Sequence, residues 1–358
     1  MFKLSNFYKG KKILITGITG FKGAWLAAWL VQLGGIVYGI GFQPNQNKKL
    51  FYSLNLKKKV KLSFFDIRSY TKVQKLINKV KPEIIFHLAA QTLIYESYKN
   101  PYNTFDINFK GTLNIIDIAR QVKFIKSIVI VTSDKCYESN NSTKGFREFD
   151  RLGGIDPYSA SKTSAEIMVR AYRKSFFQLE NNRGIGISTA RAGNVIGGGD
   201  WSFNRLIPDC IRSIIKNKKI VIRNPSYNRP WQHVLEALKG YLILAMKQYH
   251  NPKKFSGAWN FGTKPNSVTS VKSMVNYIID FWGSGKIILK NSKLYEQTNL
   301  QLNSNKAKMN LGWEPTYNIK KSVKFTVDWY KSVLKLNRDA LDVTLDQIKK
   351  YMNDSKIN

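Results

Sequence analysis

Short apolar runs recur along the first half of the chain, and segments with helical periodicity separate them. The runs cover Lys12–Thr16, Ile36–Gly41, Val60–Phe65, Ile84–Leu88, Ser127–Thr132 and Gly186–Ala190. Helical spacing of apolar residues marks Ala24–Leu33, Tyr70–Val80, Pro101–Gln121 and Pro157–Phe177. Strands that alternate with helices predict an α/β protein of the Rossmann-like class, with a doubly wound parallel sheet covered by helices on both faces.

The alternation loosens after about residue 190, where loops become frequent and the elements are mixed, as at Trp259–Gly262 and Ile287–Leu289. We therefore expect a dinucleotide-binding domain over residues 1–190, a smaller mixed α/β substrate-binding part over 191–330 and a helical C-terminal segment over 331–358. A helix near 234–249 is expected to return to the first domain. The apolar positions of Asp339–Met352 predict an amphipathic terminal helix.

Composition indicates a folded chain with an unusual charge. Of 358 residues, 43% are hydrophobic and 23% charged, which excludes disordered and low-complexity classes. The formal net charge is +35, which is compatible with a nucleic-acid or anionic-membrane partner. However, the lysines are scattered and no nucleic-acid-binding motif accompanies them, so we expect a solvated lysine surface and no nucleic-acid partner. Such a field favours anionic small molecules such as nucleotides.

Cysteine usage and the N-terminus bear on the compartment. Cys136 and Cys210 are the two cysteines, too few for a disulfide framework in a chain of this length. The N-terminal residues lack the apolar core of a signal peptide. The stretch Gly23–Asn47 carries no charge and is long enough for a membrane span, but a buried helix followed by a buried strand accounts for it better. We expect a cytoplasmic protein without a membrane segment.

A glycine-rich loop follows the first strand. Gly17, Gly20 and Gly23 have the spacing G-x-x-G-x-x-G and precede the first long helix. Glycines there let the backbone approach a pyrophosphate, which the helix N-terminus stabilises, although a plain structural turn is the alternative. Thr19, Phe21 and Lys22 of this loop are further candidate contacts of a cofactor.

The choice between NAD and NADP stays open on local grounds. Residues Gly41–Pro44, at the end of the second strand, contain neither the acid that binds the ribose of NAD nor an arginine for the phosphate of NADP. Asp66 and Ile67 close the third strand, where the carboxylate could accept a hydrogen bond from the adenine amino group. A helix cap is the alternative for Asp66.

Three residues form a candidate catalytic set. Tyr158 and Lys162 are four residues apart, on one face of a predicted helix. A lysine cation lowers the pKa of a nearby phenol, so that a tyrosinate can take a proton from a substrate hydroxyl as a hydride leaves. Ser133, at the end of a strand, supplies a hydroxyl that can bond to the same substrate oxygen.

With these motifs the sequence resembles the extended short-chain dehydrogenase/reductase family. The resemblance implies bound NAD, with Ser133 orienting the substrate and Tyr158 acting as the base. It also implies that Lys162 holds the nicotinamide ribose and lowers the pKa of Tyr158. The segment after the fourth strand, Leu88, Ala89 and Ala90, resembles the one that lies along the cofactor, while His87 by itself reads as a structural histidine.

Within that family the chain resembles the nucleotide-sugar 4,6-dehydratases, and among them the group that acts on CDP-glucose. Those enzymes carry Lys in the third place of the segment Ser133-Asp134-Lys135, where other dehydratases carry Glu. The segments Leu152–Tyr158, Arg191–Trp201 and Arg229–Val234 agree with the same group. The resemblance implies CDP-glucose as the substrate and a role in deoxysugar synthesis for surface polysaccharide such as lipopolysaccharide.

The mechanism implied by the resemblance is redox-neutral. Hydride passes from C4 of the glucose to NAD while Tyr158 takes the hydroxyl proton, and the resulting ketone acidifies the hydrogen at C5. Elimination then needs an acid at the C6 hydroxyl, for which Asp134 with a raised pKa is the candidate, and a base at C5, for which Lys135 with a lowered pKa is the candidate. Because an ion pair between these neighbours would oppose both shifts, the two roles are a hypothesis.

Three polar residues are candidates for holding the nucleotide diphosphate. Arg229 can grip phosphate oxygens with two parallel hydrogen bonds, and Asn194 and Arg205 lie in loops that can reach the same group. No metal site is expected. The resemblance also implies a homodimer or larger homo-oligomer formed through an exposed helix pair.

The sequence leaves two other functional interpretations open. A nucleotide-sugar 4-epimerase, or a dehydratase for another nucleotide-glucose, would share Ser133, Tyr158 and Lys162, and an epimerase would not need the acid Asp134. A non-catalytic dinucleotide-sensing or nucleic-acid-binding protein would keep the fold without the chemistry, and steeply salt-dependent binding to duplex DNA would favour it.

Overall fold

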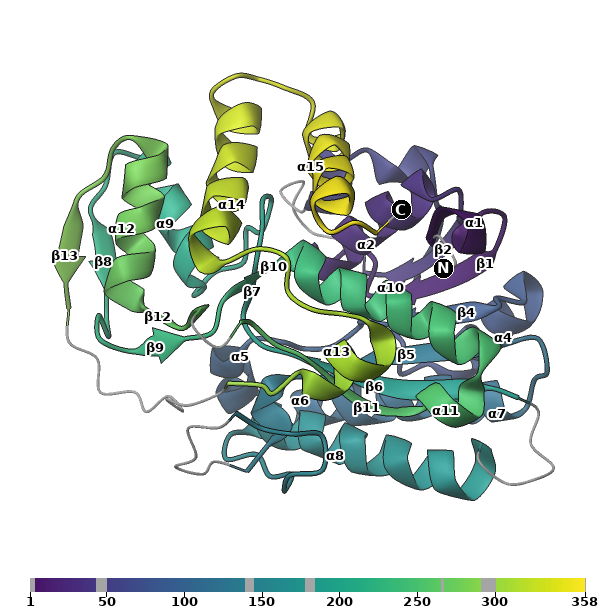
Figure 1. The fold of residues 1–358 in the computed structure, drawn as a ribbon. Coiled ribbons are helices and arrows are strands. Elements are labelled where there is room, and N and C mark those ends of the chain that lie inside the picture. Colours follow the sequence, from purple (N-terminus) through teal and green to yellow (C-terminus); the bar gives the residue numbers. More distant parts are fainter. Residues whose placement is uncertain are drawn as a thin grey trace.

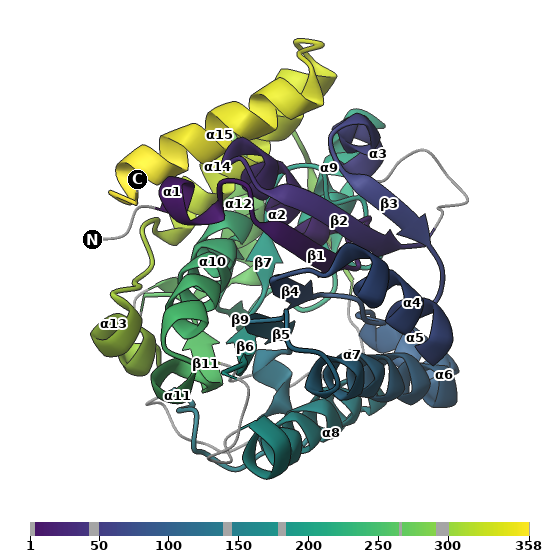
Figure 2. The same ribbon diagram turned by 90° about the vertical axis from the view of Figure 1, so that its right-hand side faces the viewer.

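One sheet of seven parallel strands forms the centre of the protein (Figures 1 and 2). The computed structural model describes residues 4–42, 50–138, 145–177, 184–264, 267–290 and 301–357. The strands are β1 (Lys12–Thr16), β2 (Ile36–Gly41), β3 (Lys61–Phe64), β4 (Ile84–His87), β5 (Ser127–Val131), β6 (Gly186–Ala192) and β11 (Gly257–Phe261). They lie in the order β11-β6-β5-β4-β1-β2-β3, and every neighbouring pair is parallel. The predicted doubly wound sheet is confirmed.

Both faces of the sheet are buried, which explains why its strands read as continuous apolar runs. Along β1, Ile13 and Ile15 belong to one hydrophobic cluster and Leu14, between them, belongs to the other. Successive side chains of a strand point to opposite faces, so an apolar residue is needed at every position where helices cover both sides. The bounds of β1 and β2 are those predicted, and those of β3 to β6 differ by one or two residues.

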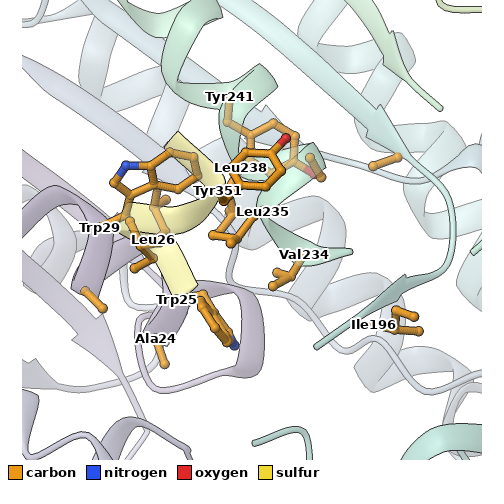
Figure 3. Packing of buried hydrophobic residues seen from close by; sticks show 14 of the residues in the cluster. Ala24, Trp25, Leu26, Trp29, Ile196, Val234, Leu235, Leu238, Tyr241 and Tyr351 are labelled. Atoms are coloured by element: carbon orange, nitrogen blue, oxygen red, sulfur yellow. The ribbon is translucent and has the colours of Figure 1, made fainter. Parts of the chain in front are cut away.

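Helices cover the two faces. One face is covered by α2 (Phe21–Gln32), α10 (Val234–His250) and α15 (Ala340–Asp354). The other face is covered by α4 (Tyr70–Val80), α7 (Gly111–Arg120) and α8 (Pro157–Tyr172). Figures 1 and 2 show α10 and α8 on opposite sides of the sheet. Figure 3 shows Trp25 and Trp29 of α2 packed toward Leu235 and Leu238 of α10. The Trp29 ring meets Tyr351 of α15 edge-on, with centroids 5.9 Å apart. The C-terminal helix and the returning helix are thereby part of the main core.

The predicted helix Pro101–Gln121 is interrupted. It consists of α6 (Pro101–Phe105), a π-helical turn (Asp106–Lys110) and α7. A π turn widens the helix by one residue and is frequent at functional sites. Here it turns Asn108 inward, where the amide is 1% exposed.

A smaller part lies beyond the carboxyl ends of the strands, at the left of Figure 1. It contains α9 (Leu206–Ile215) and α12 (Val271–Trp282) with three short pairs of strands: β7 (Val195–Ile196) with β10 (Gln232–His233), β8 (Ile220–Ile222) with β13 (Ile287–Leu289), and β9 (Asn228–Arg229) with β12 (Thr269–Ser270). The segment Trp259–Gly262, predicted among these elements, lies instead almost wholly in β11, which pairs with β6 at the edge of the main sheet. An apolar run indicates a buried strand but not its partner.

The remaining helices are short or C-terminal. They are α1 (Leu4–Tyr8), α3 (Leu50–Ser53), α5 (Ile94–Lys99), α11 (Pro252–Phe255), α13 (Asn305–Leu311) and α14 (Ile319–Leu334). Helix α14 presses on the glycine run of residues 197–199: a Cβ on Gly198 would lie 2.0 Å from Cγ of Trp329. Across the described ranges, no helix is long and apolar enough to span a bilayer. The uncharged stretch Gly23–Asn47 forms most of α2 and then β2, and its last residues lie outside the described ranges.

Candidate active site

The carboxyl ends of four central strands bring the predicted site residues to one edge of the sheet. The glycine loop follows β1, Leu88–Ala90 follow β4, Ser133–Lys135 follow β5, and Asn194 follows β6. Strand order reverses between β1 and β4, because β2 lies on one side of β1 and β4 on the other. In open α/β sheets ligands bind at such a reversal, beyond the carboxyl ends of the strands.

The glycine loop has the close packing that a dinucleotide requires. Gly17 has φ of +70°, and a Cβ there would lie 2.7 Å from the backbone nitrogen of Ala89. A Cβ on Gly23 would lie 2.3 Å from the carbonyl oxygen of Gly17, so the first turn of α2 sits directly on the loop. Gly20 is the N-cap of α2 and provides no side-chain hydrogen bond, which leaves the first N–H groups of the helix available to an anion.

Three side chains of the loop lie in different surroundings. Thr19 is buried against β2, since a Cβ on Gly41 would lie 2.7 Å from its Cγ2 atom. The Phe21 ring lies beside Gly197 of the loop that follows β7. Lys22 is half-buried, and burial together with the charges of Arg205 and Lys162 lowers its pKa to about 7, against the smaller opposing effect of Asp134. The pKa of Lys22 therefore responds to charges of the catalytic segment.

The segment after β4 is fastened to β1. Leu88 donates its backbone N–H to the carbonyl oxygen of Thr16, at 3.1 Å, and Ala89 donates to the Thr16 hydroxyl, at 3.2 Å. Both ring nitrogens of His87 are hydrogen-bonded, Nδ1 with Thr16 at 2.7 Å and Nε2 with Thr112 at 3.0 Å. Burial, and to a lesser extent the charge of Lys162, lowers the pKa of His87 to about 3, as befits a neutral structural histidine.

Asp66 and Ile67 close β3 in different ways. Asp66 accepts from the backbone N–H of Arg68 at 2.8 Å and from its guanidinium Nε at 2.9 Å. Burial opposes the resulting shift, but the hydrogen bonds and charge of Arg68 prevail and lower the pKa of Asp66. The N-cap of the following helix α4 is Ser69, so Asp66 is not its cap. Ile67 is buried and its side chain packs in the core. Gln43 and Pro44, at the end of the second strand, lie outside the described residues.

Ser133, Tyr158 and Lys162 come together at the end of β5. Burial raises the pKa of Tyr158 to about 12, and the neighbouring Ser133 side chain acts in the opposite direction. The Lys162 ammonium donates to the carbonyl oxygen of Val131, at 3.2 Å. Burial lowers the pKa of Lys162 to about 8, against the charge of Glu166, so this side chain is a cation at neutral pH.

Asp134 occupies an unusual environment within the same turn. It is 3% exposed, and its Oδ1 atom accepts from the Ser133 hydroxyl at 3.0 Å. Its buried Oδ2 atom has no hydrogen-bond partner among the described residues and lies where a Cβ on Gly193 would be 3.0 Å away. Burial raises the pKa of Asp134, although the Lys135 charge and the Ser133 hydrogen bond act in the opposite direction. The next side chain, Lys135, is half-buried.

The three candidates for phosphate binding lie around this edge. Asn194 is half-buried, and its carbonyl oxygen accepts from the backbone N–H of Gln232 at 3.0 Å. Arg205, at the start of α9, donates to Asp200 at 3.5 Å and influences the pKa of both Lys22 and Tyr158. Arg229 is 7% exposed on β9 and donates to the carbonyl oxygen of Asn228, at 3.2 Å.

Asn108 belongs to the site but escapes sequence reasoning. From the π turn, its amide nitrogen donates to Ser161 of α8 at 2.8 Å and to the carbonyl oxygen of Gln91 at 3.0 Å, and its oxygen accepts from the Gln91 N–H at 2.8 Å. It therefore ties the segment after β4 to the helix that carries Tyr158. The signal available in the sequence was a polar residue on the apolar face of a predicted helix.

The described part of the chain contains no group of three His, Cys, Asp or Glu side chains that could hold a metal ion. Cys136 and Cys210 are both buried free thiols, and burial raises the pKa of each. Neither is therefore placed or ionised as a nucleophile.

Comparisons with known proteins identify relatives of this chain. A family model described as GDP-mannose 4,6 dehydratase matches residues 14–326. The CDP-glucose 4,6-dehydratase of Salmonella typhimurium is 40% identical over 352 residues, which are 97% of this chain and 98% of that protein. The dTDP-glucose 4,6-dehydratase of Bacillus anthracis, solved in complex with NAD, has a TM-score of 0.76 at 22% identity and covers 91% of this chain and 98% of its own. The UDP-glucose 4-epimerase of Thermotoga maritima, solved with UDP-glucose, has a TM-score of 0.77 at 21% identity, with coverage of 90% and 99%. The two solved structures share the fold.

Proposed function

Because the chain belongs to the GDP-mannose 4,6-dehydratase family of extended short-chain dehydrogenases/reductases, we propose that it is a hydro-lyase that dehydrates CDP-glucose to CDP-4-keto-6-deoxyglucose. The identity of 40% to a CDP-glucose 4,6-dehydratase along nearly the whole of both chains supports this substrate. The observation that carries the reaction type is the buried Asp134 carboxyl, whose Oδ2 atom has no partner within the described residues. Such a group is suited to proton transfer to a substrate.

The loop after β1 fits a dinucleotide cofactor. A side chain at Gly17 would fill the space beside Ala89, and the N-terminus of α2 is uncapped by any side chain. The residues that would hold NAD are Gly17, Thr19–Gly23 and Leu88–Ala90, with Tyr158 and Lys162 at the nicotinamide end and Asp66 and Ile67 at the adenine end. NAD bound there would supply the hydride acceptor for oxidation at C4 of the sugar and, once reduced, the hydride for reduction at C6.

Ser133 and Tyr158 would bind the C4 hydroxyl between them. The Ser133 side chain lies near enough to affect the pKa of Tyr158, which supports the binding of one substrate oxygen by both. Tyr158 then takes the hydroxyl proton. Since burial raises the pKa of Tyr158 to about 12, the tyrosinate needs neighbouring positive charge. The charge of Arg205 acts in this direction, and the Lys162 cation, four residues along the same helix, would add to it.

Asp134 and Lys135 would carry out the elimination. A ketone at C4 makes the C5 hydrogen acidic, and Lys135 would take that proton. Asp134 gives its proton to the C6 hydroxyl, which leaves as water while the C5–C6 double bond forms. The raised pKa of Asp134 keeps the acid form available for this step.

Arg205, Arg229 and Asn194 would hold the nucleotide diphosphate. Arg205 adds its positive charge to those of Lys22 and Lys162, and this concentration of cations suits a doubly charged diphosphate. Arg229 is buried, and the residue after it, Pro230, lies next to Gly193, beside Asp134.

A homo-oligomer in the cytoplasm is part of the proposal. Tyr95, Tyr98 and Tyr102 of α5 and α6 are more than half exposed, and such aromatic residues are typical of an interface between subunits. Size-exclusion chromatography with light scattering tests the assembly, and a monomer at micromolar concentration would contradict it.

Mass spectrometry of the product tests the reaction. Purified protein incubated with CDP-glucose and catalytic NAD is expected to yield a nucleotide sugar that has lost one water, without net formation of NADH. A product of unchanged mass and new stereochemistry would instead identify a 4-epimerase, the activity of the similar Thermotoga structure. Parallel incubations with UDP-, dTDP- and GDP-sugars test the base, and preference for one of them would overturn CDP-glucose as the substrate.

A further inference from the structure

Behind the catalytic residues, one buried carboxylate collects hydrogen bonds from two strands. Glu166 of α8 is 3% exposed. Its Oε1 atom accepts from the Thr132 hydroxyl at 2.5 Å and from Arg191 Nε at 2.9 Å. Its Oε2 atom accepts from the Thr189 hydroxyl at 2.8 Å and from Arg191 Nη2 at 2.7 Å. Both oxygens thus accept from two donors each, supplied by the residue after β5 and by two residues of β6.

The same ion pair reaches both ends of the turn that carries Asp134 and Lys135. Thr132, bonded to Glu166, is the residue before Ser133. Arg191 Nη1 donates to the hydroxyl of Tyr137, which follows the turn, at 2.6 Å, and the guanidinium lies over the Tyr137 ring, 4.8 Å from its centroid. The segment from Ser133 to Cys136 is therefore fastened on either side to one rigid pair.

Glu166 also belongs to the helix that carries the other catalytic residues. It follows Lys162 by one helical turn and Tyr158 by two, and α8 is continuous from Pro157 to Tyr172. The pair thus connects the residues proposed for oxidation at C4 with those proposed for elimination at C5 and C6.

Stability alone does not account for this arrangement. A buried ion pair loses so much hydration that well-packed apolar residues of the same volume are often equally or more stable. The pair can instead serve the reaction rate by fixing the positions of the catalytic residues, because a misplacement of about 1 Å at a reacting group can cost about 100-fold in rate.

We propose that Glu166 and Arg191 are positioning residues, which hold the Ser133–Lys135 turn in register with Tyr158 and Lys162. The kinetic test of this inference rests on the proposed dehydratase function. A second test, by hydrogen exchange, needs no substrate.

Two threonines provide a matched pair of variants. Thr132→Val and Thr189→Val each remove one buried hydroxyl that donates to Glu166, and each leaves the carboxylate, Arg191 and a side chain of the same shape. Only Thr132 adjoins the catalytic turn. Neither residue touches the reacting atoms.

The expected result is a difference between the two variants. With CDP-glucose, Thr132→Val should lower kcat about 10-fold or more with little change in KM, and Thr189→Val should stay within about 3-fold of the wild type. Thermal unfolding should shift by similar amounts in both. Equal losses of kcat, or no loss in either, would overturn the inference.

Hydrogen exchange tests the same inference without a substrate. Amide exchange of residues 133–137, followed by mass spectrometry, should speed up in Thr132→Val and in Glu166→Gln but not in Thr189→Val. Glu166→Asp, which keeps the charge, should restore much of the protection. Unchanged exchange in Thr132→Val would contradict the inference, whether or not the wild type acts on CDP-glucose. A wild type that does not act on CDP-glucose would by itself refute only the proposed function.

Discussion

Replacing Asp134 by Asn separates the two halves of the proposed reaction. The amide has the shape of the acid and can still accept from the Ser133 hydroxyl, so Ser133, Tyr158 and Lys162 keep their places. It cannot give a proton to the C6 hydroxyl. Oxidation at C4 should therefore continue in Asp134→Asn, while elimination stalls.

The size of the effect follows from the site. A positioned general acid contributes about 10²- to 10⁴-fold, and the upper part of this range is expected where water cannot substitute for the acid. Asp134 is 3% exposed and its Oδ2 atom has no partner within the described residues, so bulk water has little access. We expect product formation to fall about 10³- to 10⁴-fold, which corresponds to about 4 to 5 kcal/mol in the barrier.

Single-turnover experiments measure both halves at once. Enzyme loaded with NAD is mixed with CDP-glucose, the absorbance of reduced nicotinamide reports oxidation, and quenched samples report loss of water. Asp134→Asn should accumulate reduced nicotinamide at a rate within a few-fold of the wild type and form product very slowly. If the variant dehydrated at the full rate, or lost oxidation to the same extent as dehydration, Asp134 would not be the acid of the elimination step.

The same variant makes a prediction about stability. Burial raises the pKa of Asp134 in the folded state, so its contribution to stability is fully present below the unfolded pKa and is lost as pH rises through the folded pKa. Asn has no such dependence. Asp134→Asn should therefore gain thermal stability relative to the wild type as pH rises, and calorimetry across pH 4 to 8 would refute the argument if the difference between the proteins stayed constant.

Three further predictions concern the cofactor and the base. Gly17→Ala should weaken NAD binding, measured by calorimetry, by about 10-fold or more, because its Cβ would lie 2.7 Å from a backbone nitrogen. Gly10→Ala is the control, since Gly10 has a similar φ of +74° and nothing lies within 4 Å of a Cβ there. Equal NAD affinities of the two variants would contradict the steric argument. Tyr158→Phe should slow oxidation at C4 about 10²- to 10⁴-fold with unchanged thermal unfolding, and near-normal oxidation would exclude Tyr158 as the base. Burial and nearby cations lower the pKa of Lys22 to about 7, so NAD affinity should fall as pH rises through 7 in the wild type and stay level in Lys22→Met; parallel pH profiles would refute this role.

The fold could be predicted as far as local pattern specifies it. The bounds of β1 and β2 follow from apolar runs that glycines terminate, and α4 has the predicted bounds. The local pattern does not indicate which strands pair in the sheet. The run that became β11 is as apolar as a strand of the smaller part would be, and its place beside β6 depends on contacts far apart in the sequence.

The site divides in the same way. Tyr158 and Lys162 could be predicted because their relation is a helical spacing, and the glycine loop because its three glycines are adjacent to one strand and one helix. Asn108 and Glu166 could not, because each acts through hydrogen bonds to residues that are distant in sequence. The need for glycine at position 198 also depends on a distant residue, because Trp329 of α14 occupies the space of a side chain there.

The adjacency of Asp134 and Lys135 matters for the two proton transfers proposed for them. If the two side chains formed an ion pair, each charged form would be stabilised and neither acid nor base would be available. Among the described residues, however, Asp134 bonds through Oδ1 to Ser133, and its Oδ2 atom points toward Gly193 rather than to the Lys135 ammonium. Burial then outweighs the Lys135 charge and raises the pKa of Asp134. A sugar bound with C6 toward Gly193 and C5 toward Lys135 would meet the Asp134 carboxyl on one side and the Lys135 side chain on the other, so neighbouring residues could serve opposite proton transfers.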